Sequence, residues 1–193
     1  MNGFSNYLRL GYEHIVSLEA LDHIVFLVAL MAVYSLKHWL RIVIAATFFT
    51  VGHSITLSLG ALQIVKVDQS LIEFLIPLTI LLTALFNLTK AGQNAKNRSK
   101  YWLAGLFGLI HGLGFSNYYG MLTIGDSNYW QALLPFNLGV ELGQLAVIGA
   151  ILLVLLVYEI FLNKKLRDWN FFLSGAAFGL SFIMCLETWP FSV

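Results

Sequence analysis

The residues able to do chemistry in this sequence are ionisable side chains placed inside strongly apolar segments. Asp22 and His23 stand together near the start of one such segment, while His53 and His111 lie well inside two others. An imidazole or carboxylate at mid-membrane costs several kcal/mol unless it is paired, neutralised or facing water. These four residues are therefore candidates for function.

A further apolar segment carries Asn137, Glu141 and Gln144 at helical spacing. By helical rise, Glu141 reaches about the same depth as His111. Imidazole and carboxylate together are ligands for borderline divalent ions such as Ni²⁺, Co²⁺ and Zn²⁺. We expect Asp22, His23, His53, His111 and Glu141 to converge on one metal site.

Neighbouring polar residues would orient these ligands by hydrogen bonding, as partners of metal-bound imidazoles do. The candidates for that role are Glu19, Thr50, Asn137 and Gln144. A simpler reading is open for the histidines, since one histidine in a membrane helix can merely bond a neighbouring helix. Asp22 and His23 could also lie near enough to the membrane interface for water to form their hydrogen bonds.

The elements that must position these residues are membrane helices. Of 193 residues, 59% are hydrophobic and only 11% are charged, and the mean hydropathy is +0.79. A soluble domain of this size cannot hide so much apolar surface, whereas lipid can solvate it. The net charge of +1 gives no indication of nucleic acid as a partner. The single cysteine, Cys185, excludes an internal disulfide.

A membrane-spanning helix needs about 20 apolar residues. We predict an all-α protein with one transmembrane domain over 1–193 and a short amphipathic helix at 4–17 in the membrane interface. Six segments are long and apolar enough to span: 20–37, 41–64, 70–90, 101–119, 131–161 and 170–188.

Basic residues indicate the orientation, because they concentrate on the cytoplasmic side of membrane proteins. Nine of the 11 lie in the loops that follow the first, third and fifth predicted spans, and only Arg9 and Lys66 lie on the other side. We predict an integral protein of the bacterial inner membrane, with both termini facing the periplasm. The N-terminal segment lacks the apolar run of a cleavable signal peptide.

Four motifs in this order resemble the HupE/UreJ family of small membrane proteins, and the resemblance covers nearly the whole chain. They are Gly11-Tyr-Glu-His14 with Asp22-His23, Phe49-Thr-Val-Gly-His53, Phe107-Gly-Leu-Ile-His111, and Phe136-Asn-Leu-Gly-Val-Glu141-Leu-Gly-Gln144. The resemblance implies a nickel or cobalt permease. It also implies metal-handling roles for His14, Asp22, His23, His53, His111 and Glu141. His14 ranks below the others because the link from Ile15 to Leu21 lacks the glycine of many members.

Our leading hypothesis is a divalent-metal permease in the lipid bilayer, for Ni²⁺ or Co²⁺ first, as a single chain, a homo-oligomer or with a membrane partner. Because protons compete for the ligands, metal binding should depend on pH. An intramembrane zinc hydrolase is the main alternative, with Glu141 as the base acting on a zinc-bound water. A non-catalytic subunit of a membrane assembly is a third. A permease needs a polar route to both faces, whereas a hydrolase needs a cavity open on one side.

Overall fold

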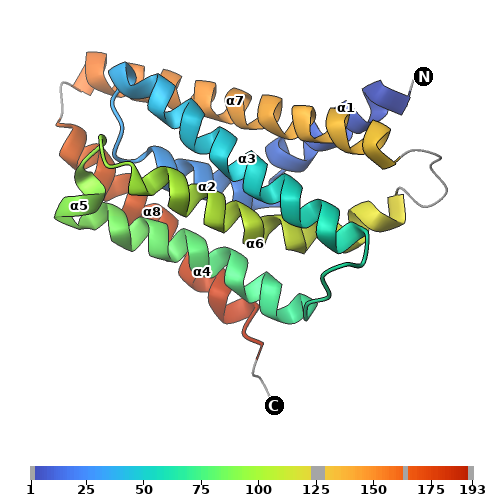
Figure 1. The fold of residues 1–193 in the computed structure, drawn as a ribbon. Helices are drawn as coiled ribbons and strands as arrows, with labels where there is room; N and C mark the ends of the chain where they lie inside the picture. The colour runs from blue at the N-terminus through green and yellow to red at the C-terminus, as the bar shows by residue number, and fades with distance from the viewer. Residues whose placement is uncertain (1–2, 123–128, 163–164, 191–193) are drawn as a thin grey trace.

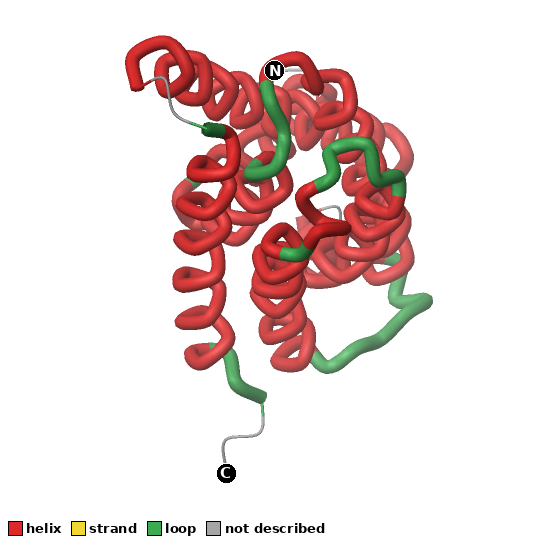
Figure 2. The backbone as a smooth tube through the Cα atoms, turned by 90° about the vertical axis from the view of Figure 1, so that its left-hand side faces the viewer, coloured by secondary structure: helices red, strands yellow, loops and turns green. Residues whose placement is uncertain are grey.

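The computed structural model describes residues 3–122, 129–162 and 165–190. Within these ranges the chain is helical and contains no strand (Figure 2). The helices are α1 (Gly3–Val16), α2 (Leu21–Met31), α3 (Trp39–Ala61), α4 (Gln69–Leu88), α5 (Lys90–Gln93), α6 (Ser99–Leu122), α7 (Tyr129–Leu162) and α8 (Leu166–Glu187). Two short 3₁₀ turns, Leu18–Ala20 and Leu36–His38, precede α2 and α3.

Long helices pack side by side in pairs around the short helix α2 (Figure 1). Helix α1 packs on α7, α3 on α6, and α4 on α8. Helix α2 contacts members of all these pairs, and its buried side chains include His23 and Phe26. Residues from α1, α2, α3 and α6 therefore come close together at the centre of the bundle.

Within the described residues, four helices are long and apolar enough to cross a membrane, over 36–61, 69–88, 130–161 and 166–187. They correspond to four of the six predicted spans. Helix α6 includes the whole predicted span 101–119, but Lys100, His111 and Asn117 make it less apolar than these four helices. It packs closely on α3 instead of offering a uniformly apolar surface.

The predicted first span, 20–37, is not confirmed. Helix α2 ends at Met31, and its 11 residues reach only about 16 Å, roughly half the hydrocarbon thickness. It follows α1 after a bend of 56°, and the two together could form a fifth, broken span. Polar residues of the link, Ser17 and Glu19, lie at the bend, where Ser17 Oγ accepts a hydrogen bond from the Glu19 amide.

The N-terminal helix exists, but an interfacial position for it is not confirmed. Helix α1 lies along α7, with Gly11 and Ile15 buried in the contact. A Cβ atom at Gly11 would collide with the Phe136 carbonyl oxygen, so glycine permits the close approach of the two backbones. This packing brings His14, one turn beyond Gly11, to the bundle interior.

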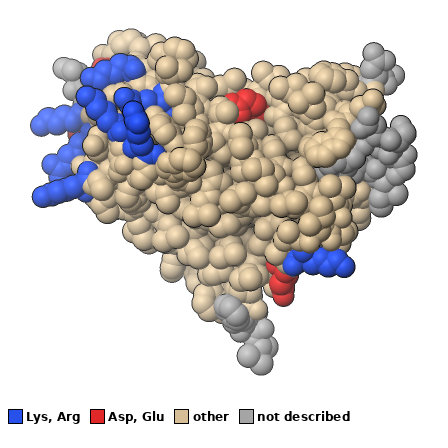
Figure 3. All heavy atoms as spheres, viewed as in Figure 1, with Lys and Arg blue, Asp and Glu red and all other residues tan. Residues whose placement is uncertain are grey.

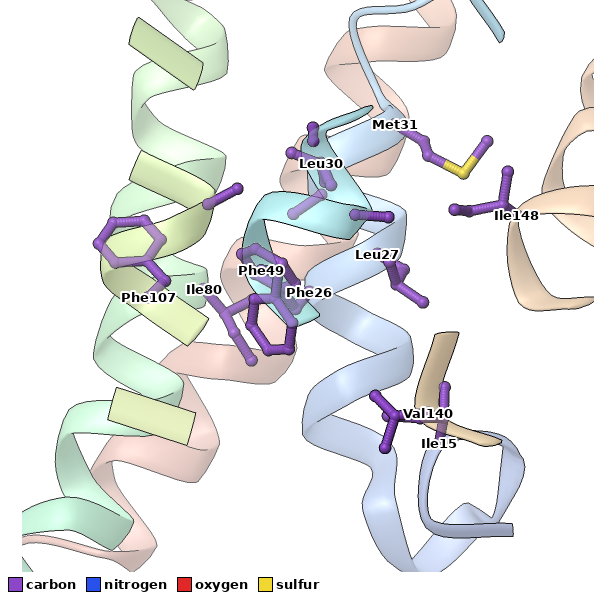
Figure 4. Packing of buried hydrophobic residues seen from close by; sticks show 14 of the residues in the cluster. Ile15, Phe26, Leu27, Leu30, Met31, Phe49, Ile80, Phe107, Val140 and Ile148 are labelled. Atoms are coloured by element: carbon purple, nitrogen blue, oxygen red, sulfur yellow. The ribbon is translucent and has the colours of Figure 1, made fainter. Parts of the chain in front are cut away.

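Phenylalanines fill the core where α2, α3 and α6 meet (Figure 4). The ring centroids of Phe26 and Phe49 lie 4.8 Å apart, and those of Phe26 and Phe107 lie 6.4 Å apart. Ile80 of α4 lies beside them (Figure 4). These rings border the buried histidines.

Candidate metal centre

Four helices bring together four histidines and one aspartate. His14 comes from α1, Asp22 and His23 from α2, His53 from α3 and His111 from α6. We call these five residues the histidine cluster. The ring of His23 lies at its centre, with centroid distances of 4.7 Å to His14, 6.0 Å to His53 and 5.2 Å to His111.

The cluster contains two groups of residues that could each hold a metal ion. One is His14, His23 and His53, and the other is Asp22, His23 and His111. In each group, one ligand atom per residue lies within 4.8 Å of the others. His23 belongs to both groups. The two groups are therefore neighbouring metal positions that share one ligand residue.

The cluster lies deep in the bundle. His53 is 0% exposed and His111 is 1% exposed, and His23 is also buried. Such side chains have little contact with bulk water, so their ring nitrogens need partners from the protein, from bound water or from a bound ion.

Hydrogen bonds orient two of the rings. His23 Nδ1 lies 3.0 Å from Asp22 Oδ1, and His111 Nε2 lies 3.1 Å from Thr79 Oγ1. The Thr79 hydroxyl donates its proton to the Ile76 carbonyl at 2.7 Å, so it accepts a hydrogen bond from His111 Nε2–H. His23 Nε2 and His111 Nδ1 are left with lone pairs, as neutral imidazole ligands require.

Five ring nitrogens of the cluster are buried and have no hydrogen-bond partner among the described residues. They are His14 Nε2, His23 Nε2, both ring nitrogens of His53, and His111 Nδ1. Buried polar atoms are nearly always paired, so this concentration of ring nitrogens without partners needs an explanation. A divalent metal ion bound by neutral imidazoles provides one, and the donor set fits such an ion.

An open cavity of about 720 Å³ leads to the cluster, with His14, Asp22, His23 and His111 in its wall. Three further carboxylates line it, those of Glu13, Glu19 and Glu73. Acidic side chains raise the local concentration of cations. The carboxylates therefore give the cavity a lining that attracts cations.

Aromatic rings border the other side of the cluster. Phe49 lies 5.0 Å from His111 and 6.1 Å from His53, and Phe26 lies 5.6 Å from His111, between ring centroids. These rings offer no ligand for a cation. Neither Phe26 nor Phe49 is in the wall of the cavity.

The predicted ligand Glu141 belongs to neither group. Its carboxylate accepts hydrogen bonds from the hydroxyls of Thr47, at 2.7 Å, and Thr50, at 2.6 Å. Thr50 Oγ1 also lies 3.1 Å from Gln144 Oε1. Thr50 and Gln144 thus lie beside Glu141 between α3 and α7. Among the described residues, neither forms a hydrogen bond with a histidine.

The other two predicted supporting residues, Asn137 and Glu19, also belong to neither metal group. Asn137 donates its amide proton to the Leu133 carbonyl of its own helix at 3.0 Å. Glu19 is exposed and lines the cavity entrance. Sequence reasoning missed Thr79, the partner of His111, because a threonine in an apolar helix carries no signal of its neighbour on another helix. It also did not single out Glu73, which lines the cavity.

These observations define an integral membrane protein with a buried histidine cluster able to hold a metal ion. A family model described as HupE / UreJ protein matches residues 1–189, and the chain belongs to this family. The family assignment made from the four motifs is thus confirmed. No curated protein and no solved structure matches the chain.

Proposed function

We propose that this protein is a membrane permease for a divalent transition metal, Ni²⁺ or Co²⁺ first. The observation that carries the proposal is the histidine cluster, in which two possible metal groups share His23 at the inner end of an acidic cavity. Membership of the HupE/UreJ family supports nickel or cobalt as the substrate.

The two groups suggest a path for the ion. The cavity wall includes Asp22, His23 and His111, so an entering ion would meet this group first. There Asp22 would offset part of its charge, and the imidazoles would replace part of its water shell. Because His23 is shared, the ion could move to His14 and His53 without losing all its protein ligands.

For transport to be complete, the ion must then pass the phenylalanines beside the cluster. Phe26 and Phe49 are both buried, with centroids 4.8 Å apart. We infer that the described conformation is open to one side and that these side chains or their helices move during transport. Alternating exposure of one central site is the general mechanism of such carriers.

The test is metal uptake into liposomes containing the purified protein. His53→Ala and His111→Ala should each reduce both Ni²⁺ binding and Ni²⁺ uptake by at least tenfold, because each removes a ligand from one group. His38→Ala is the matched control, since His38 lies at the start of α3, where it bonds Ser35 Oγ at 2.8 Å. Full metal stoichiometry with no uptake by the unmodified protein would refute the permease.

An intramembrane zinc hydrolase is the second candidate, and the one-sided cavity favours it. Asp22, His23 and His111 would bind Zn²⁺ and leave a position for water. The placement of Glu141 argues against its role as the base, because Thr47 and Thr50 hold its carboxylate. We therefore keep transport first.

We also propose the bacterial inner membrane as the location, with both termini facing the periplasm. Figure 3 shows most of the basic side chains in view gathered at one end of the molecule, around the end of Figure 1 where α5 lies, with one more at the lower right. The labelled chain ends lie away from it (Figure 1). Basic residues favour the cytoplasmic side, so this separation supports the orientation.

A further inference from the structure

A second cavity, of about 460 Å³, lies between α2, α4 and α6. Its wall is largely apolar and includes Leu30, Phe86 and Leu103. Phe26 and Phe107 also line it, and Phe26 touches the histidine cluster on its other side. None of the five cluster residues is in the wall of this cavity.

One cation is buried in the wall of this cavity. Lys100 is 4% exposed, and its Nζ has no hydrogen-bond partner among the described residues. The ammonium group lies 4.9 Å from the centroid of the Tyr34 ring, which offers a cation–π contact. An ammonium has three protons to donate, so its hydrogen-bonding capacity is unused.

The other polar residues in the wall already have partners within the protein. Thr83 Oγ1 donates to the Thr79 carbonyl at 2.8 Å, and the Asn87 amide donates to the Ala29 carbonyl at 2.6 Å. Thr89 Oγ1 donates to the Phe86 carbonyl at 2.7 Å. Lys100 is thus the polar group of this wall that has no hydrogen-bond partner among the described residues.

This chemistry excludes the cavity as a route for a divalent cation. The buried ammonium of Lys100 repels cations, and the residues lining the cavity include no carboxylate or imidazole. The same features suit a molecule with an apolar chain and an anionic group. Its volume falls within the range of about 300–1,000 Å³ typical of ligand pockets.

The cavity has access to the membrane. Leu82 and Leu85 of α4 line it and are exposed at the surface of a helix apolar enough to span a membrane. The exposed basic residues Lys96 and Arg98, shortly before Lys100, mark this end of α6 as cytoplasmic in the proposed orientation. Basic pockets between membrane helices on the cytoplasmic side bind anionic lipid headgroups.

We propose that this cavity binds an anionic membrane lipid. An acyl chain enters between α2, α4 and α6, and the phosphate of the headgroup accepts hydrogen bonds from Lys100 Nζ. The site is independent of the proposed permease activity, since it contains no residue of the histidine cluster. Bound lipid would fix the spacing of these helices beside Phe26 and Phe107.

The experiment uses the full chain purified in detergent, stripped of lipid and then given either phosphatidylglycerol or phosphatidylcholine with the same acyl chains. Native mass spectrometry should show phosphatidylglycerol retained at least tenfold more strongly by the unmodified protein. Lys100→Gln should abolish this preference. Lys96→Gln, which removes an exposed charge four residues away, should keep it. Ala104→Leu, which narrows the cavity but leaves Lys100, should reduce retention of both lipids.

Three results would overturn the proposal. The first is equal retention of the two lipids by the unmodified protein, a measurement that needs no variant to fold. The second is an unchanged preference in Lys100→Gln. In the third, inorganic phosphate alone displaces the lipid at low concentration, which would identify an anion site without a chain pocket. Transport of Ni²⁺ by the unmodified protein is measured in a separate experiment. Failure of the lipid proposal can therefore be distinguished from failure of the permease proposal.

Discussion

At the scale of residues, the histidine cluster depends on how each imidazole is held. Asp22 orients His23 and Thr79 orients His111, and in both rings the other nitrogen keeps its lone pair. His53 has no hydrogen bond from either ring nitrogen among the described residues, and its ring stacks on Phe49. Hydrogen bonds therefore orient two ligands of the cluster, His23 and His111. His53 is positioned mainly by packing.

Glu141→Gln tests whether this carboxylate acts at the metal. We expect the variant to keep full metal stoichiometry, because Glu141 is in neither group and a glutamine retains one carbonyl oxygen for Thr47 or Thr50. Its stability should fall by about 1 kcal/mol, a typical value for a hydrogen bond between membrane helices. Metal analysis and thermal unfolding of the purified variant measure both effects.

Other outcomes of the same substitution have distinct meanings. A loss of metal as large as that of His53→Ala would make Glu141 a ligand. Retained Zn²⁺ with a hydrolytic turnover lowered by about 10²–10⁴ would make it the general base of an enzyme.

At the scale of elements, glycines let the helices that carry the histidines approach closely. A Cβ atom at Gly112 of α6 would collide with the His53 carbonyl oxygen and the Thr56 hydroxyl of α3. The neighbouring residue is His111, so the distance between the α3 and α6 backbones at this point also sets the separation of two cluster histidines. Backbone packing and metal geometry are coupled here.

Gly112→Ala should therefore disturb both packing and metal binding. We expect the free energy of unfolding to fall by about 1–3 kcal/mol, as in other overpacked sites. Ni²⁺ affinity should fall as well, because α3 must move away from α6. Gly149→Ala on α7 is the control, since nothing lies within 4 Å of a Cβ atom there. Equal effects of the two substitutions, measured by unfolding and Ni²⁺ titration, would contradict the coupling.

At the scale of the whole molecule, the two cavities and the basic side chains lie in different parts of the protein. The acidic cavity opens at the bend between α1 and α2, and the cavity of Lys100 lies on the far side of the phenylalanines. Most of the basic side chains in view gather at one end (Figure 3). The ends of the molecule therefore differ in charge.

The proposed orientation predicts that tags at either terminus are labelled from outside intact cells. A cysteine introduced at Lys96, in the basic region between α4 and α6, should react with an impermeant reagent only after lysis. This follows from the retention of basic loops in the cytoplasm during insertion. Labelling of Lys96→Cys in intact cells, with unlabelled termini, would reverse the orientation and place the acidic cavity on the cytoplasmic side.

The sequence by itself determined the class of the protein and the residues to examine. Apolar segments such as 41–64 and 70–90 predict helices directly, because the cost of unpaired backbone groups in lipid leaves few alternatives. Ionisable residues inside those segments are costly, so His53 and His111 were identifiable without a structure. The four motifs were sufficient for the family, which covers residues 1–189.

Only the tertiary structure decided which of these residues meet. The rotation and bending of helices depend on contacts between distant segments, and helical spacing does not encode them. The 56° bend and the packing of α1 on α7 bring His14 to His23, although its motif ranked it last. Helix α7 presents Glu141 to Thr47 and Thr50 instead of to the histidines, and α4 supplies Thr79 to His111. These partners lie on separate helices, so packing alone could assign them.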